Sequence, residues 1–461
     1  MKRPNIVFIL IDDLGWRDLS CYGSTFYETP VLDGLAERGM RFTDAYAASP
    51  VCSPTRASIL SGKYPARVGV TDWIGSATRG RLLEPPYTHC LPLEEKCLAA
   101  ALREGGYATW HVGKWHLGGR AYYPENHGFD VNVGGCDWGA PPQGYFSPWG
   151  IPTLRDGPAG QYLTDRLTDE AIGLIRGQDR GRPFFLYMSH YAVHTPIQAL
   201  PQDLSKYEAK VKASGLDRVK TFEEGEFFPS ESKRHRRVVR RLVQSDPAYA
   251  AMVENLDWNT GRLLQALRDA GQADDTIVLF TSDNGGLATA EGSPTCNRPL
   301  AEGKGWMYEG GTREPLIVHW PGVTEGGTLC PTPVTSPDFY PTILEMAGLD
   351  PLPQQHVDGA SMVPLLQGRQ ADRERALFWH YPHYGNQGGS PACSMRLGDF
   401  KLIEFFEDGR RELYNLRQDI GEDRDLAAAD PQRAGSMQRM LADWRQSVDA
   451  RLPMPNPDWR E

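Results

Sequence analysis

The stretch PVCSPTRASILSG, Pro50–Gly62, is the one around which the rest of the chain is organised. Cys52 precedes a predicted helix start, where Ser53 can cap the first turn and Pro54 suits it because its missing N–H would lack a partner there. Arg56 follows one helical turn after Cys52, so both side chains can face one point. The stretch therefore gathers a nucleophilic side chain, a guanidinium and a helix N-terminus around a spot that suits a tetrahedral oxyanion.

Acidic and amide side chains follow two predicted buried strands. They are Asp12 and Asp13 after residues 5–11, and Asp283 and Asn284 after residues 276–281. Strands of a parallel sheet end at one edge, so these groups can converge on one hard cation, and oxygen ligands favour Ca²⁺ or Mg²⁺. Each group taken singly is also consistent with a solvated turn. The repetition of the design favours a metal site.

Lysine and histidine side chains follow two further predicted strands. Lys114 and His116 come after residues 107–112, and in extended backbone they would share one face. Such a pair suits an anion pocket and a proton transfer, although two solvent-exposed surface side chains without a function are the alternative. His194 lies beyond the strand predicted over residues 183–190 and is expected to be functional.

These motifs resemble the signatures of the type I sulfatases of the alkaline phosphatase superfamily, and are most like bacterial arylsulfatase-like carbohydrate sulfatases. Cys52-Ser53-Pro54-Thr55-Arg56 is similar to the signature whose cysteine is converted to formylglycine, the nucleophile. Residues 106–117 resemble a second signature, and the resemblance spans about residues 5–414. Many members have serine where this chain has Thr55, which leaves the main positions of the motif intact.

The resemblance implies a metal centre and a set of catalytic residues. Ca²⁺, with Mg²⁺ as the alternative, would be held by Asp12, Asp13, Asp283 and Asn284 and would contact Cys52 after its conversion. The residues implied to carry the chemistry are Cys52, Arg56, Lys114, His116, His194 and Lys304. Within this set, Arg56 and Lys114 would stabilise the nucleophile and the sulfate charge. His194 and Lys304 would hold the sulfate and help protonate the leaving oxygen. After the alcohol departs, His116 would accept a proton from the remaining hydroxyl of residue 52, which expels sulfate and restores the aldehyde.

The order of elements predicts an α/β fold. Its main part is a large mixed, mostly parallel sheet sandwiched by helices, as in alkaline phosphatase, followed by a smaller C-terminal antiparallel sheet plus helix. We expect a catalytic domain over residues 1–374 and an α+β subdomain over residues 375–461, because short strands follow one another from about residue 375. Helices are predicted over residues 30–40, 93–103, 163–176, 249–270 and 431–450.

Composition limits the partners. The 461 residues include 49 Lys+Arg and 59 Asp+Glu, and the net charge of −10 argues against general affinity for nucleic acid or an anionic membrane. No apolar run reaches the length of a membrane span. Residues 6–11 are too short for a signal-peptide core, so we expect a cytoplasmic protein, or a periplasmic or secreted one if an export leader was removed.

Two segments have no assignment from the motifs. The highly charged segment Ser205–Arg241 is predicted to be a solvated helix face, with a docking surface for nucleic acid or polyanionic glycan as the alternative. Residues 118–160 are rich in glycine, proline and aromatics, which is typical of a functional loop or of a packing cluster. We predict that Asp137 and Trp138 from this loop, with His383, form a sugar pocket; inward packing of Trp138 and a turn capped by Asp137 are the alternative.

The sequence thus predicts hydrolysis of a sulfate ester, with a galactose- or N-acetylgalactosamine-type sulfate as the expected substrate. Its partners would be a sulfated small molecule or glycan and, during maturation, a formylglycine-generating enzyme. A phosphomonoester or phosphonate hydrolase of the same superfamily is the first alternative, although a two-metal phosphatase would need more acids and histidines. A glycan-binding pseudo-enzyme is the second.

Overall fold

The computed structural model describes residues 3–369 and 375–460. Within them, a nine-stranded sheet has the order β11-β2-β10-β9-β1-β6-β4-β5, with β12 paired to β2. β10 is antiparallel to β2 and β9, whereas β9, β1, β6, β4 and β5 are parallel. The strands are β1 (Asn5–Ile11), β2 (Met40–Tyr46), β4 (Ala108–Gly113), β5 (Val131–Val133), β6 (Phe184–Ser189), β9 (Thr276–Ser282), β10 (Arg313–His319), β11 (Thr328–Cys330) and β12 (Val334–Thr335).

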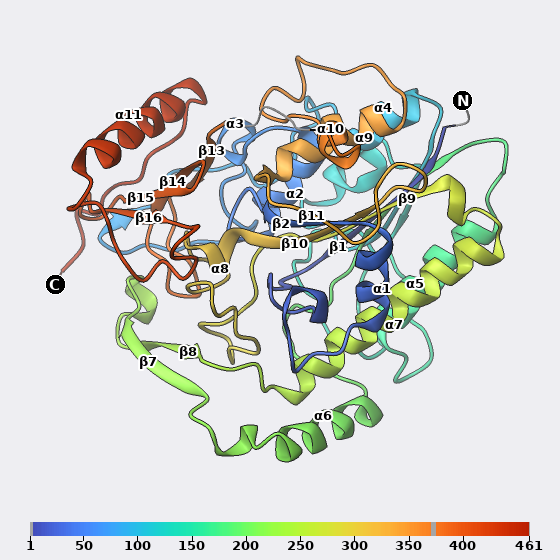
Figure 1. Ribbon diagram of the computed structural model, residues 1–461, viewed down its shortest axis with the longest axis horizontal. Helices are drawn as coiled ribbons and strands as arrows, with labels where there is room; N and C mark the ends of the chain where they lie inside the picture. The colour runs from blue at the N-terminus through green and yellow to red at the C-terminus, as the bar shows by residue number, and fades with distance from the viewer. Residues whose placement is uncertain (1–2, 370–374, 461) are drawn as a thin grey trace.

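Helices cover both faces of this sheet (Figure 1). Successive side chains of β1 point to opposite faces, so residues 7, 9 and 11 join one hydrophobic core and residues 6, 8 and 10 join the other. The first core contains α1 (Pro30–Arg38), α5 (Leu163–Arg176) and α7 (Pro247–Asp269), and α6 (Pro201–Ala213) packs on α7. The second contains α2 (Cys52–Ser61), α3 (Pro65–Val68), α4 (Leu98–Glu104), α9 (Phe339–Met346) and α10 (Val363–Leu366).

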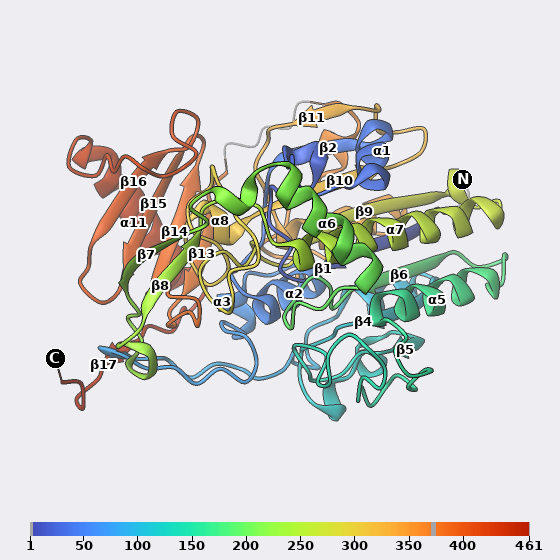
Figure 2. The same cartoon turned by 90° about the horizontal axis from the view of Figure 1, so that it is seen from below.

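A four-stranded antiparallel sheet follows, in the order β13-β14-β15-β16. It stands beside the main sheet, at the left of Figure 2. Its strands are β13 (Leu377–Tyr381), β14 (Ala392–Leu397), β15 (Phe400–Phe405) and β16 (Arg411–Asn415), and α11 (Pro431–Ser447) packs on them. This arrangement confirms the predicted fold class. The predicted boundary at residues 374/375 adjoins residues 370–374, which lie outside the described residues.

The charged segment Ser205–Arg241 is not the predicted helix face. α6 ends at Ala213, and β7 (Phe222–Phe227) and β8 (Arg237–Arg241) then form an antiparallel hairpin. Arg240 pairs across this hairpin with Glu226, an ion pair between neighbouring strands that the charge pattern alone did not reveal. A second short pair joins β3 (Leu82–Leu83) to β17 (Met454–Pro455).

The helix predicted over residues 93–103 begins five residues later, as α4. Tertiary hydrogen bonds hold the preceding turn instead: Tyr340 donates to the carbonyl of Lys96, and Lys63 binds the carboxylate of Glu95. Within residues 3–369 and 375–460, no helix has both the length and the apolar composition that a membrane span requires.

Candidate active site

The predicted functional side chains meet at the carboxyl edge of the main sheet. Four strands end there in polar loops, because α/β sheets place such loops at a common edge. The residues brought together are Asp12 and Asp13 after β1, Lys114 and His116 after β4, His194 after β6, and Asp283 and Asn284 after β9. Cys52 begins α2 at the same place, and Lys304 comes from the loop before α8 (Glu309–Thr312).

The start of α2 differs in one detail from the prediction. Cys52 is the first helical residue, and Ser53 does not cap the helix. The Ser53 hydroxyl donates instead to the carbonyl of His116 at 3.0 Å and accepts from the N–H of Ile74 at 3.1 Å. It therefore joins the helix start to two neighbouring segments of the site.

His116 faces residue 52 with one ring nitrogen. Its Nδ1 lies 3.3 Å from Cys52 Sγ, and its Nε2 lies 3.1 Å from the carbonyl oxygen of Ile74. A carbonyl can only accept, so Nε2 carries the proton and Nδ1 is the acceptor. Burial, and next the charge of Lys114, lower the pKa of His116 well below its usual value, which keeps the ring neutral.

Two buried cations neutralise two of the acids. Arg56 donates through Nε to Asp283 Oδ2 at 2.8 Å and through Nη1 to the carbonyl of Lys114 at 3.0 Å. Lys114 Nζ donates to Asp12 Oδ2 at 2.6 Å. Buried carboxylates need such partners because an isolated charge in the interior is costly.

A third cation lies beside the third acid. Lys304 Nζ donates to Asp13 Oδ2 at 2.7 Å and lies 3.0 Å from His194 Nε2. His194 Nδ1 lies 2.8 Å from the carbonyl oxygen of Thr195, so Nδ1 carries the proton and Nε2 accepts from Lys304. Burial, and next Lys304, lower the pKa of His194 to about 3.

The acids and the amide fit a hard cation. Asp12 Oδ1 and Asn284 Oδ1 are buried and have no hydrogen-bond partner among the described residues. Ligand atoms of Asp12, Asp13 and His194 lie within 4.8 Å of one another. Burial raises the pKa of Asp12 to about 8, and Asp283 and Asp13 add to the rise against the opposing effect of Lys114. A divalent ion among these oxygens would stabilise the ionised carboxylates and so lower the pKa of Asp12 again.

A cavity of about 580 Å³ opens over these groups. Asp137 and Trp138 line it together with Cys52, His116, His194 and Lys304. Trp138 is 49% exposed, so the inward packing considered for it is wrong. Asp137 Oδ1 accepts from the Tyr123 hydroxyl at 2.8 Å, which leaves its other oxygen for a ligand.

The placement of His383 in this pocket is wrong. His383 is fully buried, and its ring bonds Thr71 at 2.9 Å and Glu84 at 3.0 Å, because the chain after β13 turns inward there. The same loop reaches the cavity a few residues later, through Asn386 and Gln387. Sequence reasoning missed these two residues, as well as Trp73 and Glu291, because all lie in irregular segments without a motif.

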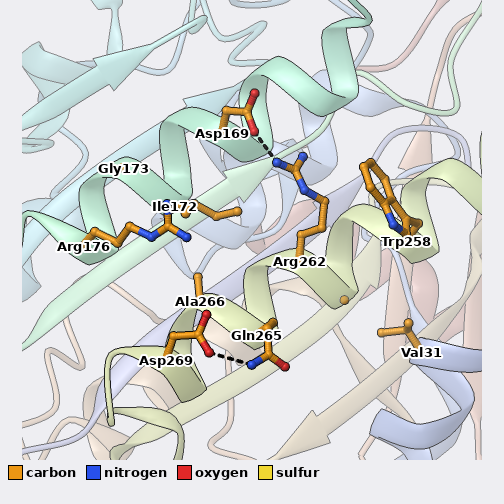
Figure 3. Close-up of a pocket in the computed structure, with 11 residues that line it drawn as sticks. Val31, Asp169, Ile172, Gly173, Arg176, Trp258, Arg262, Gln265, Ala266 and Asp269 are labelled. Atoms are coloured by element: carbon orange, nitrogen blue, oxygen red, sulfur yellow. Dashed lines mark hydrogen bonds and ion pairs between the residues drawn. The ribbon is translucent and has the colours of Figure 1, made fainter.

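Another cavity, of about 620 Å³, lies between α5 and α7 (Figure 3). Arg262 pairs with Asp169 there and lies over the ring of Trp258. Its described lining contains none of the predicted site residues. Predicted site residues such as Cys52, His116 and Lys304 instead line the cavity at the sheet edge.

Comparisons with known proteins identify the family. Residues 4–349 match the family described as Sulfatase, and residues 302–447 match the one described as N-sulphoglucosamine sulphohydrolase, C-terminal. The chain belongs to the sulfatase family. It is therefore a sulfuric ester hydrolase by family, as the motifs predicted.

Relatives and solved structures resemble it over most of its length. N-acetylgalactosamine-6-sulfatase of Homo sapiens is 34% identical over 396 residues, which cover 81% of this chain and 67% of that protein. A sulfatase of Formosa agariphila is 35% identical over 507 residues, with 93% and 85% covered. A crystal structure of Ps i-CgsB in complex with k-i-k-neocarrahexaose superposes with a TM-score of 0.75 at 28% identity, covering 99% of this chain and 95% of that one.

Proposed function

We propose that this sulfatase cleaves sulfate esters of a carbohydrate, of the galactose or N-acetylgalactosamine type, with residue 52 as formylglycine and one bound Ca²⁺. The observation that carries the proposal is the meeting of Cys52, His116 and Lys304 in one cavity beside three buried acids. The sugar type is supported by the names of the relatives, which include N-acetylgalactosamine-6-sulfatase.

The charges of the site suit a sulfate monoester. Three carboxylates, of Asp12, Asp13 and Asp283, are matched by three cations, of Arg56, Lys114 and Lys304. A divalent ion would leave this centre with an excess of about two positive charges, which an anionic substrate can neutralise. When bound, Ca²⁺ would act as a Lewis acid on the sulfate and would orient it; Mg²⁺ is the alternative.

The neutral imidazole of His116 is placed to take a proton from residue 52. Its Nδ1 faces that side chain as an acceptor, and Ile74 fixes this tautomer by accepting from Nε2. The hydrate of formylglycine supplies a nucleophilic oxygen at this position, which the thiol cannot. For that reason we also propose a formylglycine-generating enzyme as a maturation partner.

Lys304 and His194 would act on the sulfate and its leaving oxygen rather than on residue 52. Although burial lowers the pKa of Lys304, Asp13 raises it well above its usual value, so the ammonium stays charged and can bind a sulfate or leaving-group oxygen. His194 accepts from that ammonium and so orients it. Arg56 and Lys114 pair with Asp283 and Asp12, and they would stabilise the charge that develops on the sulfate.

The alternatives are less well supported. A two-metal phosphatase needs a second set of acids and histidines beside the first, whereas Arg56 and Lys114 occupy the space next to Asp283 and Asp12. A pseudo-enzyme would be expected to lose some of the catalytic and metal-binding residues that the family resemblance implies, whereas this chain has kept all ten, from Asp12 to Lys304.

Mass analysis of the peptide that contains residue 52, combined with assays on sulfate and phosphate esters, tests the proposal. We expect formylglycine in active protein, a strong preference for sulfate esters, and loss of activity on chelation that Ca²⁺ restores. Cys52→Ala should be inactive, and Cys97→Ala, at a buried cysteine away from the cavity, is the matched control. An unmodified thiol in fully active enzyme would refute the formylglycine assignment.

A further inference from the structure

A cavity other than the one in Figure 3 adjoins the catalytic one, and we call it the second cavity. It has a volume of about 540 Å³ and lies between the β7–β8 hairpin and the loop of residues 289–293. Glu291 lines both cavities. Lys233, from the hairpin, donates through Nζ to the carbonyl of Asn386 at 2.8 Å, and Asn386 lines the catalytic cavity. The hairpin is therefore attached to the wall of the active site.

Some basic residues of the hairpin are paired with acids, whereas others are not. Arg240 is neutralised by Glu226 and Glu302, and Arg241 pairs with Asp246. Three others line the second cavity and have no carboxylate within 4.0 Å among the described residues: Lys233, Arg236 and Arg237. In the described lining of this cavity these three basic side chains face one acidic residue, Glu291, so positive charge is in excess there in a protein whose net charge is −10.

Aromatic rings hold two of these cations in place. Arg237 lies over the ring of Phe227 at 4.3 Å, and Lys233 lies 5.4 Å from the ring centroid of Phe228. Such contacts orient a cation without neutralising it. Arg236 is exposed, and its side chain has no hydrogen bond within the described part of the chain. Its five N–H donors are therefore available to a ligand.

We propose that this cavity is a subsite for a second anionic group, a sulfate or carboxylate, on the sugar next to the one whose ester is cleaved. The proposal rests on the proposed carbohydrate sulfatase function. Glu291, which accepts from Gln387 at 3.0 Å, stands between the two cavities and can accept sugar hydroxyls there. The substrate class that fits is an oligosaccharide with an anionic group on each of two adjacent sugars.

Arg236→Gln tests the subsite. We would compare three substrates: a galactose-type disaccharide sulfated on both sugars, the same disaccharide sulfated only at the cleaved position, and 4-nitrophenyl sulfate. A charge-assisted hydrogen bond is worth about 1.5–3 kcal/mol, so KM for the doubly sulfated disaccharide should rise about tenfold or more at low salt. The other two substrates should change less than twofold, and the difference should shrink as salt is added.

Arg234→Gln is the matched control because it removes the same charge from the same hairpin. Arg234 points to the C-terminal segment, where it donates to the carbonyl of Arg460, and it does not line the cavity. Equal effects of both variants, or no effect of Arg236→Gln on the doubly sulfated disaccharide, would overturn the subsite.

Failure of the subsite and failure of the proposed function give different results. Wild-type enzyme that hydrolyses none of the three sulfate esters would contradict the function itself. In that case calorimetric binding of the doubly sulfated disaccharide to Cys52→Ala, with and without Arg236→Gln, still decides the subsite. About tenfold weaker binding in the double variant supports it, and equal binding rejects it.

Discussion

Lys401 lies at the centre of a buried charge network between the C-terminal sheet and the catalytic core. Its side chain is 1% exposed, and its Nζ lies 3.0 Å from Glu309 Oε1 and 3.0 Å from Glu422 Oε1. Glu309 has other partners, Arg313 at 2.7 Å and the Tyr46 hydroxyl at 2.8 Å. Apart from its ion pair with Lys401, Glu422 Oε1 has no polar partner among the described residues, so this oxygen depends on the lysine.

We expect Lys401→Met to destabilise the fold by about 3 kcal/mol at pH 8. Removing one partner of a buried pair costs roughly 3–5 kcal/mol, and Arg313 moderates that cost by keeping Glu309 compensated. Burial raises the pKa of Glu422 to about 7 against the effect of Lys401, and loss of the lysine would raise it further. A raised carboxyl pKa contributes stability that is present below about 4.5 and lost as the pH rises through about 7. The variant should therefore lose more at pH 8 than at pH 6.

Urea unfolding followed by tryptophan fluorescence, at pH 6 and pH 8, measures this loss. The double variant Lys401→Met/Glu422→Gln should recover part of it at pH 8, because no uncompensated carboxylate remains at position 422. A loss below about 1 kcal/mol at pH 8, or an equal loss at both pH values with no recovery in the double variant, would refute the reasoning.

Two further predictions concern the catalytic cavity. A Cβ added at Gly139 would lie 2.5 Å from His116 Cε1, so Gly139→Ala should displace the ring and lower kcat at least about tenfold, with little change in Tm. Steady-state kinetics and thermal unfolding would measure both effects, and an unchanged kcat would contradict the prediction. Gly173→Ala is the control, because a Cβ added there meets open space. Asp137→Ala should lower kcat/KM on a sulfated glycan by roughly tenfold to a hundredfold and on an aryl sulfate far less. Equal losses on both would indicate that Asp137 acts mainly through Tyr123.

The convergence of the site was predictable from the sequence because it follows from topology. Buried strands such as residues 5–11 and 276–281 are recognisable as apolar runs, and parallel strands end at one edge. Local geometry was less predictable. Lys114 and His116 do reach the same centre, but not by the extended alternation expected of them: His116 has a φ of 56°, a left-handed conformation.

The lining of the substrate cavity depends on contacts that no local pattern encodes. Asn386 and Gln387 belong to the C-terminal sheet's first loop, and they reach the catalytic cavity because that sheet packs against the core. The wrong placement of His383 has the same cause, since the loop that carries it turns inward before it turns toward the cavity. Under the proposed function, the strand ends would carry the chemistry of sulfate, whereas the choice of glycan would fall to segments positioned by tertiary packing. Substitutions in the Lys401 network that loosen the C-terminal sheet should accordingly impair glycan selection before they impair hydrolysis of a small aryl sulfate.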